Sequence, residues 1–429
     1  MKIMLIGGGG REHAIIKKLR ENPAVETIYA LRGSGGISRE AQCVSIPATD
    51  LGAIVEFAKE KRPDFTVVAP DDPLAMGLVD RLQELGLACF GPTAAAARIE
   101  GSKSFAKDLM KAHNIPTAEY AVFEELEAAK DYVRAHPGPL VVKADGLALG
   151  KGVLICENQE QALAALEQIM GEKAFGSSGD KVVIEEFLTG PEVSVLSFTD
   201  GKTIVPMLSS MDHKRALEGD QGLNTGGMGV IAPNPFYTPE VAAQCMEQIF
   251  LPTIRAMAEM GCPFKGCLYF GLMLTPKGPR VIEYNCRFGD PEAQAVLSLL
   301  ESDLLSIMQA VQQERLDQVE VRFREGASCC LILASSGYPL AYEKGLPITD
   351  ATEGLEQLIV YHSGTKLAPD GSLLTSGGRV LGVTGLGDTL QEAVDRVYEG
   401  ARHIHFPKVY YRRDIGRKAL AVLAGEAQE

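Results

Sequence analysis

The segment from Arg280 to Glu292 brings acidic, amide and basic side chains together at alternating positions. If it begins as a β-strand, Glu283, Asn285 and Arg287 point to one face, because strand side chains alternate between the two faces. Carboxylate and amide oxygens suit Mg²⁺, which takes its remaining ligands from water and nucleotide phosphates. An arginine beside them would stabilise a phosphoryl group during its transfer. The segment therefore predicts a phosphoryl-transfer site, and an exposed strand face with a local ion pair is the alternative.

Lys143 to Val153 form a glycine-rich segment between two expected strands. It is not a Walker A loop, because Asp145 occupies the place of that motif's first glycine and Lys151 is followed by Gly152 rather than by serine or threonine. A glycine-rich hairpin flanked by lysines can instead fold over a triphosphate and meet its oxygens with amide and ammonium groups. A purely structural hairpin is the alternative, but the lysine that ends the apolar strand favours a nucleotide site.

Two further segments have the character of ligand-binding loops. Glu185-Glu186-Phe187-Leu188 follows an apolar strand, and the backbone of such a hinge can contact an adenine edge while apolar side chains cover the ring. Asp212-His213-Lys214-Arg215 and Leu223 to Gly229 lie on one long connection, and long ordered loops are usually functional. His213 could also be an ordinary solvated loop residue.

The glycines Gly7 to Gly10 follow a short expected strand and precede a helical pattern, so their backbone amides can approach a phosphate. The dinucleotide fingerprint would place a glycine at position 12 or 13, where Glu12 and His13 stand, and this argues against NAD. Arg11 could add a charge-assisted hydrogen bond to the phosphate. A loop that serves only the turn is the alternative.

These segments must be positioned by the elements around them, and apolar periodicity predicts an α/β and α+β protein with several domains. Over residues 1–102 strands alternate with helices, which predicts a doubly wound parallel-sheet domain. We expect its strands at 2–6, 27–31 and 64–69 and a helix at 51–61. A helical stretch at 94–113 follows and is broken at Gly101-Ser102-Lys103.

Two α+β lobes and a C-terminal α+β unit are expected after this domain. The smaller lobe has strands at 140–143, 153–156 and 182–185 and a helix at 159–170. The larger lobe has strands at 193–198, 204–208, 267–274 and 280–285 and a helix at 239–260. Strands at 329–334 and 378–384 and a helix at 390–400 form the C-terminal unit. The expected domains are residues 1–102, 103–188, 189–325 and 326–429.

Length and composition argue against several classes of protein. A chain of 429 residues is too long for one hydrophobic core, and a net charge of −14 argues against a nucleic-acid or anionic-membrane partner. The short apolar run before Gly7 predicts no signal peptide, and no segment reaches the length of a transmembrane helix. Nine cysteines without C-x-x-C spacing indicate reduced thiols, so we expect a cytoplasmic protein.

Several of these motifs, in their order along the chain, resemble the ATP-grasp superfamily, in which two α+β lobes close on ATP. They are Gly101-Ser102-Lys103, Lys143 with its glycine hairpin, the hinge from Glu185 to Leu188, and Glu283-x-Asn285. A closer resemblance, over most of the chain, is to the glycinamide ribonucleotide synthetase family. It rests on Gly9–His13, Lys143–Ala148, Asp212–Arg215, Asn224–Gly229, Asn285–Glu292 and Gly377–Val380.

The resemblance implies a ligase of purine biosynthesis, with a pre-ATP-grasp N-terminal domain, an ATP-grasp core and a small C-terminal domain. ATP would phosphorylate the carboxylate of glycine, and the amine of 5-phosphoribosylamine would attack the acyl phosphate, giving glycinamide ribonucleotide, ADP and phosphate. The implied catalytic residues are Lys143, Asp212, His213 and Arg287. The implied ligands of Mg²⁺ or Mn²⁺ are Glu283 and Asn285.

The resemblance also implies which residues contact the substrates. The expected ATP contacts are Lys103, Lys143, Gly146, Gly150, Lys151, Gly152, Glu185, Glu186, Phe187, Leu188 and Glu192. The expected contacts to glycine or the sugar phosphate are Gly9, Gly10, Arg11, Lys214, Asn224, Thr225, Gly226, Gly227, Asp290 and Glu292. Another ATP-grasp ligase or carboxylase of purine metabolism, and a non-catalytic nucleotide-binding module, are the alternatives. We expect a monomer or a weak dimer.

Three positions depart from the family's pattern. Many ATP-grasp enzymes carry another acidic metal ligand on the strand before Glu283, but Gly271 stands at the equivalent place, so water or phosphate would complete the metal shell. Arg32-Gly33-Ser34-Gly35-Gly36 and Pro70-Asp71-Asp72-Pro73-Leu74 replace two other family motifs. The contacts to the ribosyl substrate therefore stay open.

Overall fold

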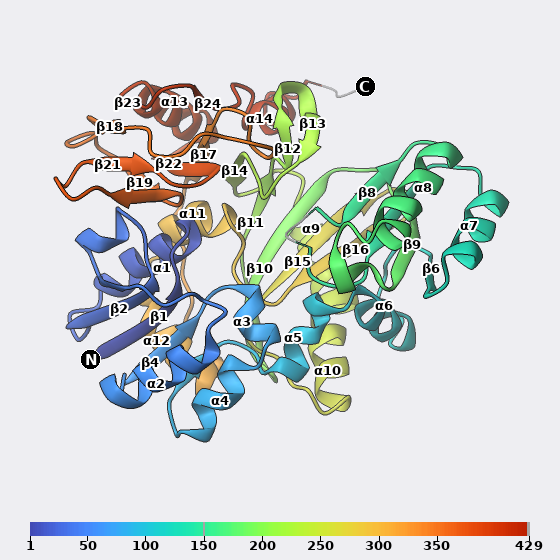
Figure 1. Ribbon diagram of the computed structural model, residues 1–429, viewed down its shortest axis with the longest axis horizontal. Coiled ribbons are helices and arrows are strands. Elements are labelled where there is room, and N and C mark those ends of the chain that lie inside the picture. Colours follow the sequence, from blue (N-terminus) through green and yellow to red (C-terminus); the bar gives the residue numbers. More distant parts are fainter. Residues whose placement is uncertain (149–150, 427–429) are drawn as a thin grey trace.

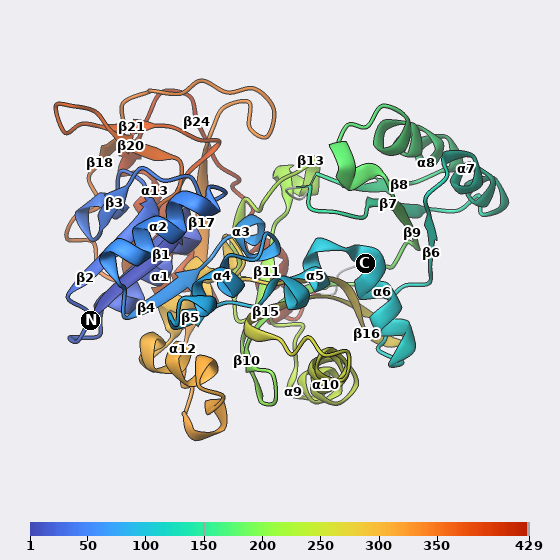
Figure 2. The ribbon, with the colours of Figure 1, turned by 60° about the horizontal axis from the view of Figure 1, so that its bottom comes forward.

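The computed structural model of the protein describes residues 1–148 and 151–426, so the predicted ATP contact Gly150 lies outside the described residues. Figure 1 shows the N-terminal and C-terminal domains next to each other, with a small lobe on the opposite side of the molecule. A large lobe lies between them (Figure 2). None of the described helices is both long enough and apolar enough to cross a lipid bilayer.

The N-terminal domain is the predicted doubly wound sheet, and its strands pair in parallel in the order β3-β2-β1-β4-β5. The strands are β1 (Lys2–Gly7), β2 (Thr27–Arg32), β3 (Gln42–Val44), β4 (Phe65–Val68) and β5 (Cys89–Phe90). The helices are α1 (Gly10–Arg20), α2 (Leu51–Lys61), α3 (Asp71–Ala75) and α4 (Leu78–Glu84). β1 is the central strand and leads into α1, so the loop at Gly8 and Gly9 lies at the edge where such sheets bind ligands.

The helical stretch at 94–113 consists of two helices, α5 (Ala94–Gly101) and α6 (Lys103–Ala112), as the break at Gly101-Ser102-Lys103 predicted. Ser102 caps α6, because its Oγ accepts a hydrogen bond from the amide of Phe105 at 3.2 Å. Asp145 Oδ1 accepts a second one from the amide of Ser104 at 2.6 Å. The start of α6 is thereby tied to the glycine hairpin.

The small lobe is a four-stranded antiparallel sheet in the order β6-β9-β7-β8, covered by two helices. Its elements are β6 (Tyr120–Phe123), α7 (Leu126–Ala135), β7 (Leu140–Ala144), β8 (Val153–Cys156), α8 (Gln159–Leu166) and β9 (Val182–Glu186). A π-helical turn at Glu167–Gly171 continues α8. β7 and β8 pair from Leu140 with Cys156 to Lys143 with Val153, which confirms a hairpin between the two predicted strands.

The large lobe and the C-terminal strands form one continuous sheet in the order β16-β15-β10-β11-β14-β17-β22-β19. Its strands are β10 (Glu192–Asp200), β11 (Ile204–Asp212), β14 (Gly229–Ala232), β15 (Lys265–Thr275), β16 (Gly278–Asn285), β17 (Ala327–Ser335), β19 (Leu358–His362) and β22 (Arg379–Gly387). The buried strand β14 pairs with β11 on one side and with β17 on the other. The unit expected at 326–429 therefore shares its sheet with the large lobe.

Helices cover this sheet and shorter elements complete the chain. The helices are α9 (Pro239–Cys245), α10 (Leu251–Glu259), α11 (Glu292–Val296), α12 (Leu304–Gln312), α13 (Leu390–Ala401) and α14 (Arg417–Leu423). A π-helical turn at Met246–Phe250 joins α9 to α10 along the helix expected at 239–260. The short strands are β12 (Arg215–Leu217), β13 (Gln221–Asn224), β18 (Thr349–Asp350), β20 (Thr365–Leu367), β21 (Leu373–Thr375), β23 (Ile404–His405) and β24 (Val409–Tyr410).

Candidate active site

A cavity of about 490 Å³ lies where the N-terminal domain, both lobes and the C-terminal domain meet. Each of these parts contributes charged side chains to its wall, including Arg11, Asp71, Lys103, Lys143, Glu283, Arg287 and Arg379. A second cavity of about 770 Å³ extends between the small and large lobes along the hinge at Glu185–Leu188. Lys143, Glu185, Asp212, Lys214, Asn224 and Glu283 line both cavities, so the two are neighbours.

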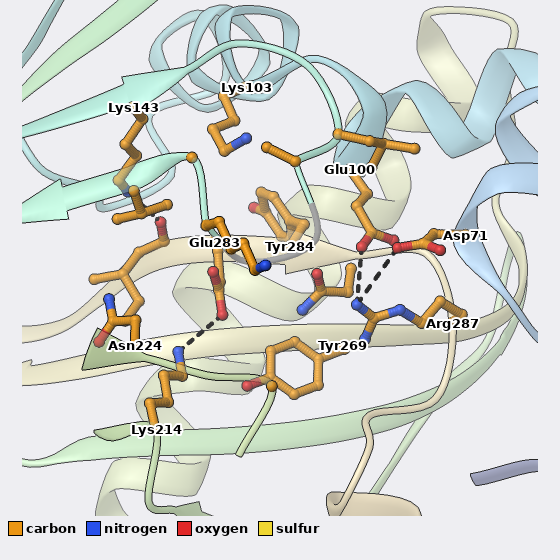
Figure 3. A pocket seen from close by; sticks show the side chains of 18 of the residues that line it. Asp71, Glu100, Lys103, Lys143, Lys214, Asn224, Tyr269, Glu283, Tyr284 and Arg287 are labelled. Carbon is orange, nitrogen blue, oxygen red and sulfur yellow. Dashed lines mark hydrogen bonds and ion pairs between the residues drawn. The ribbon is translucent and has the colours of Figure 1, made fainter. Parts of the chain in front are cut away.

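The predicted metal ligands Glu283 and Asn285 both line the first cavity, as their alternation on β16 predicted. Figure 3 shows Glu283 facing Lys214. Glu283 Oε1 lies 3.0 Å from Lys214 Nζ. Burial by itself would raise the pKa of Glu283, but Lys214, with help from Lys143 and Arg287, lowers that pKa to about 2. The carboxylate is therefore ionised and its oxygens are available as ligands at neutral pH.

The structure explains why a glycine, and not an acidic residue, stands at position 271. Gly271 pairs with Glu283 across β15 and β16, and a Cβ atom at Gly271 would lie 2.7 Å from Glu283 Cγ. No side chain fits there without moving Glu283. The described residues contain no group of three or more His, Cys, Asp or Glu side chains that could hold a metal ion. One carboxylate and one amide oxygen nevertheless fit Mg²⁺, whose remaining ligands can come from water and nucleotide phosphates.

Arg287 reaches from the large lobe to two carboxylates that the sequence motifs did not identify as partners. Its Nη2 lies 3.1 Å from Glu100 Oε1 and 3.9 Å from Asp71 Oδ2 (Figure 3). Glu100 also accepts a hydrogen bond from the amide of Cys286 at 2.7 Å. Burial raises the pKa of Glu100, although Arg287 opposes this shift. Asp71 belongs to one of the motifs that depart from the family, whereas Glu100 lies in an ordinary helical pattern without a distinguishing signal.

Lys143 meets Glu185 inside the small lobe. Lys143 Nζ lies 2.8 Å from Glu185 Oε1, and Lys107 Nζ lies 3.0 Å from Glu185 Oε2. Burial lowers the pKa of Lys107 to about 8, against the influence of Glu185. The sequence motifs missed Lys107, although it follows Lys103 by four residues on α6 and so shares its helix face. The Glu185 side chain is thus a buried counter-ion for two lysines.

Lys103 supports the base of the glycine hairpin. Its Nζ donates hydrogen bonds to the carbonyl oxygens of Ala144 at 2.8 Å and Gly146 at 3.0 Å. Its pKa is lowered by burial and by the neighbouring Lys143. Lys151 and Gly152, at the other end of the hairpin, line the first cavity.

The hinge residues that follow Glu185 line the second cavity rather than the first. Glu186, Phe187, Leu188 and Glu192 all belong to its wall. Phe187 is 40% exposed, so part of its ring is open to a ligand. This cavity therefore has the apolar and backbone groups that a purine ring requires.

Asp212 lines the first cavity, where little offsets the cost of burying its negative charge. Its Oδ1 is buried and has no hydrogen-bond partner among the described residues. Burial and the neighbouring Glu292 raise the pKa of Asp212 well above its ordinary value. Burial likewise raises the pKa of Glu292. The two acidic groups thus form a buried pair that favours holding a proton.

His213 was expected among the catalytic residues, but the main chain engages both of its ring nitrogens. Nδ1 lies 3.1 Å from the carbonyl oxygen of Gly229, and Nε2 accepts a hydrogen bond from the amide of Gly416 at 3.2 Å. Burial and nearby Arg412 lower the pKa of His213 to about 4. The alternative of a solvated loop residue is wrong, because His213 is only 5% exposed.

Arg379 connects the C-terminal domain to the predicted substrate residues. It donates hydrogen bonds to the carbonyl oxygens of Gly226 and Asp290, both at 2.6 Å, and its Nη2 lies 3.3 Å from Asp290 Oδ2. A Cβ atom at Gly226 would lie 2.9 Å from the Arg379 guanidinium carbon. Gly227 has a φ of +107°, and a Cβ atom there would lie 2.6 Å from Asp212 Oδ1. Glycines at these positions therefore permit the close packing of the loop.

Among the N-terminal residues predicted for the site, Arg11 lines the first cavity and Gly9 and Gly10 do not. Arg11 lines the first cavity, where its Nε lies 2.6 Å from Glu12 Oε1 and its Nη1 donates to the carbonyl oxygen of Phe288 at 3.2 Å. A Cβ atom at Gly10 would lie 2.4 Å from Gln294 Nε2 and 2.6 Å from Ser363 Oγ, so Gly10 packs against the large lobe and the C-terminal domain. A Cβ atom at Gly9 would first meet Glu12 of its own domain, at 2.9 Å. Lys214, Asn224, Thr225 and Gly226 also line the first cavity.

Domain models of one family match consecutive parts of the chain. The N domain of phosphoribosylglycinamide synthetase matches residues 1–100, its ATP-grasp (A) domain matches residues 101–293, and its C domain matches residues 328–418. A phosphoribosylamine–glycine ligase of Agrobacterium fabrum is 47% identical over 421 residues, which cover 98% of this chain and 99% of that protein.

Solved structures share the whole fold. The crystal structure of phosphoribosylamine–glycine ligase from Thermotoga maritima has a TM-score of 0.85 and 34% identity, over 97% of this chain and 100% of that one. The biotin carboxylase domain of a 2-oxoglutarate carboxylase from Hydrogenobacter thermophilus has a TM-score of 0.75 over 100% of this chain and 99% of that chain. Its identity is 16%, so this likeness concerns the fold alone.

Proposed function

Because the chain belongs to the phosphoribosylglycinamide synthetase family, we propose that it joins glycine to 5-phosphoribosylamine while ATP is converted to ADP and phosphate. The chain is a ligase of purine biosynthesis. One observation carries the assignment of its site: Lys143 of the small lobe and Glu283 and Arg287 of the large lobe line a single cavity. Phosphoryl transfer requires mainly such positioning and charge neutralisation.

The nucleotide occupies both cavities in this proposal. Its purine lies along the hinge at Glu185–Leu188, and its phosphates extend toward Lys143 and Lys151. Bound Mg²⁺ or Mn²⁺ would neutralise phosphate charge at Glu283 and Asn285, which would hold it together with the phosphates. Arg287 is oriented by Glu100 and Asp71 toward the same space, where it would stabilise the transferring phosphoryl group.

The reaction then has two balanced steps. A carboxylate oxygen of glycine attacks the terminal phosphorus of ATP, and the bond to ADP breaks. The amine nitrogen of 5-phosphoribosylamine next attacks the acyl carbon, the bond from that carbon to the phosphate oxygen breaks, and phosphate leaves. One proton must leave the nitrogen, and Asp212 Oδ1, which lacks a hydrogen-bond partner among the described residues, is the acceptor that we propose. A carboxylate whose pKa is raised by burial and by a neighbouring acidic group is a stronger base than an ordinary one.

The remaining predicted residues hold the substrates. We assign Lys214, Asn224, Thr225 and Gly226 to glycine and the sugar phosphate, because they line the same cavity as Glu283. Arg11 contributes a cation from the N-terminal domain. His213, with both nitrogens bound to main chain, serves as a positioning residue. All nine cysteines are unpaired thiols, which supports a cytoplasmic location, and we propose a monomer or a weak dimer.

A substrate-dependence assay tests the proposal. Phosphate release from ATP is expected to require glycine and 5-phosphoribosylamine together, and glycinamide ribonucleotide is expected to form in equal amount. Release of phosphate with bicarbonate in place of glycine would contradict the assignment and favour a carboxylase. Arg287→Lys is the matched variant, because it retains a charge but loses the planar guanidinium that faces Glu100.

A further inference from the structure

The hairpin of β12 and β13 projects from the large lobe and has little support of its own. Its strands form a separate two-stranded sheet. Leu217 and Leu223 are 48% and 52% exposed, so burial of apolar surface contributes little to holding it in place. A lone two-stranded hairpin is only marginally stable in water. Contacts from elsewhere must therefore hold this one.

The C-terminal segment from β24 to α14 supplies those contacts (Figure 1). Tyr410 Oη donates to the carbonyl oxygen of Ala216 at 2.9 Å, on the first strand of the hairpin. At the tip, the amide of Gly219 donates to Asp414 Oδ2 at 2.8 Å. At the base, the amide of Gly416 donates to His213 Nε2. Strand, tip and base of the hairpin are thus each bonded to the C-terminal domain.

Arg412 lies at the centre of these contacts. Its Nε and Nη2 each lie 2.8 Å from an oxygen of Asp414, and its Nη1 lies 3.0 Å from Asp220 Oδ1 at the hairpin tip. The same Nη1 donates to the carbonyl oxygen of Arg215 at 3.1 Å. Arg412 is only 1% exposed, so these charge-assisted bonds are shielded from water. Asp220 has a φ of +54°, a conformation that its ion pairs with Arg412 and Lys418 help to hold.

The hairpin and the residues next to it contribute to the walls of both cavities. Lys214, which precedes β12, and Asn224, the last residue of β13, line both cavities. Thr225 and Gly226 face only the first cavity, while Arg215 and Asp220 face only the second. Thr225 is fixed to the other end of the hairpin, because its amide and its hydroxyl both donate to the carbonyl oxygen of Lys214 at 2.8 Å. A shift of the hairpin would therefore disturb both binding sites at once.

We propose that Arg412 is a positioning residue, which holds the β12–β13 hairpin in place beside both cavities through Asp220 and Asp414. The inference rests on the proposed function, since it assigns the second cavity to the purine of ATP and the first cavity to the ATP phosphates and to the amine and glycine substrates. Arg412 itself touches neither substrate. It acts by keeping Lys214, Asn224 and Thr225 in place for both.

The test compares Arg412→Met, Arg412→Lys and Asp220→Asn in the full chain, with Arg413→Met as the control. Arg413 is the exposed neighbour, and its main-chain amide, which the substitution keeps, donates a hydrogen bond to Glu218 Oε1 of the hairpin. For Arg412→Met we expect KM for ATP and for 5-phosphoribosylamine to rise together by about tenfold or more, with kcat changing by less than about threefold. Arg412→Lys is expected to recover part of the loss. Asp220→Asn, which suits the same backbone conformation, should give a smaller rise.

Hydrogen exchange provides a readout that does not require ligase activity. Peptides covering 215–226 are expected to exchange faster in Arg412→Met, while peptides of the N-terminal sheet exchange as in wild type. A fall in kcat with both KM values unchanged would overturn the proposal, because it indicates only a smaller folded fraction. Unchanged exchange in 215–226 would also overturn it. Failure of the wild-type chain to release phosphate with both substrates would instead overturn the proposed function. The exchange result would still show whether Arg412 holds the hairpin.

Discussion

Lys214 Nζ lies 3.0 Å from Glu283 Oε1, so the carboxylate assigned to a divalent cation is also the partner of an ammonium group. The two cations would compete for this oxygen, because both are attracted by the same negative charge. Metal binding would then free Lys214 to contact the substrates in the cavity that it lines. The ion pair thereby links the metal site to the substrate loop.

Glu283→Gln should reduce kcat by about 100-fold or more, since a neutral amide is a poor metal ligand and charge neutralisation supplies several kcal/mol to such reactions. The thermal unfolding midpoint should change little, because Glu283 is about one-third exposed. Phosphate release measured across a Mg²⁺ titration checks this. A wild-type rate at limiting Mg²⁺ would show that the cation binds elsewhere.

Gly271→Ala should lower activity by about tenfold, because the added Cβ atom would lie 2.7 Å from Glu283 Cγ and displace the ligand. The Mg²⁺ concentration for half-maximal rate should increase as well. Gly52→Ala on α2 is the matched control, since its Cβ atom would lie 3.7 Å from Asp50 Oδ1, which is an ordinary van der Waals contact. Equal activities of the two variants would contradict the role of this close approach.

Glu185→Gln should lower the free energy of unfolding by about 3 to 5 kcal/mol, because it leaves Lys107 and Lys143 buried without their counter-ion. Glu186→Gln, one residue on, should cost less than about 1 kcal/mol, since that side chain is 43% exposed and lies 3.7 Å from its partner Arg280. Urea unfolding of both variants gives the comparison. Similar losses would mean that the buried pairs contribute no more than the exposed one.

Asp212→Asn should reduce kcat by about 100-fold or more and remove the acid limb of its pH profile. The wild-type rate should fall as pH decreases through the raised pKa of Asp212, because protonation removes the base. The profile of kcat from pH 5 to pH 9 checks this, with 5-phosphoribosylamine kept saturating. Persistence of the acid limb in the variant would assign it to another group, such as Glu292.

His213→Gln should flatten the dependence of stability on pH between about 6.5 and 4. The pKa of His213 is lowered to about 4 in the folded chain, so the unfolded chain binds a proton that the folded chain does not in this range. The contribution of neutral His213 is therefore present above pH 6.5 and lost as pH falls, by up to about 3 kcal/mol. Urea unfolding at pH 7.5 and pH 4.5 measures it. An equal pH dependence in both proteins would contradict the buried neutral state.

Local sequence determined the elements and much of the site. Apolar alternation and helical spacing predicted β1, α2 and β16, because these patterns record which face of an element is buried. The alternation of Glu283 and Asn285 likewise placed both on one wall, since it depends only on the strand that carries them. Ser102 at a helix break was also a local signal.

Only the tertiary structure decided which charges meet. Glu100 and Asp71 pair with Arg287, and Arg412 meets Asp220, although each pair is separated by many other charged residues along the chain. Only the tertiary structure likewise decided that the large lobe and the C-terminal strands share one sheet, because any exposed strand edge offers similar hydrogen-bonding groups. Helix and strand periodicity reports burial within one element. Which side chains pair depends on how distant elements pack, and all of the contacts between those elements together determine that packing.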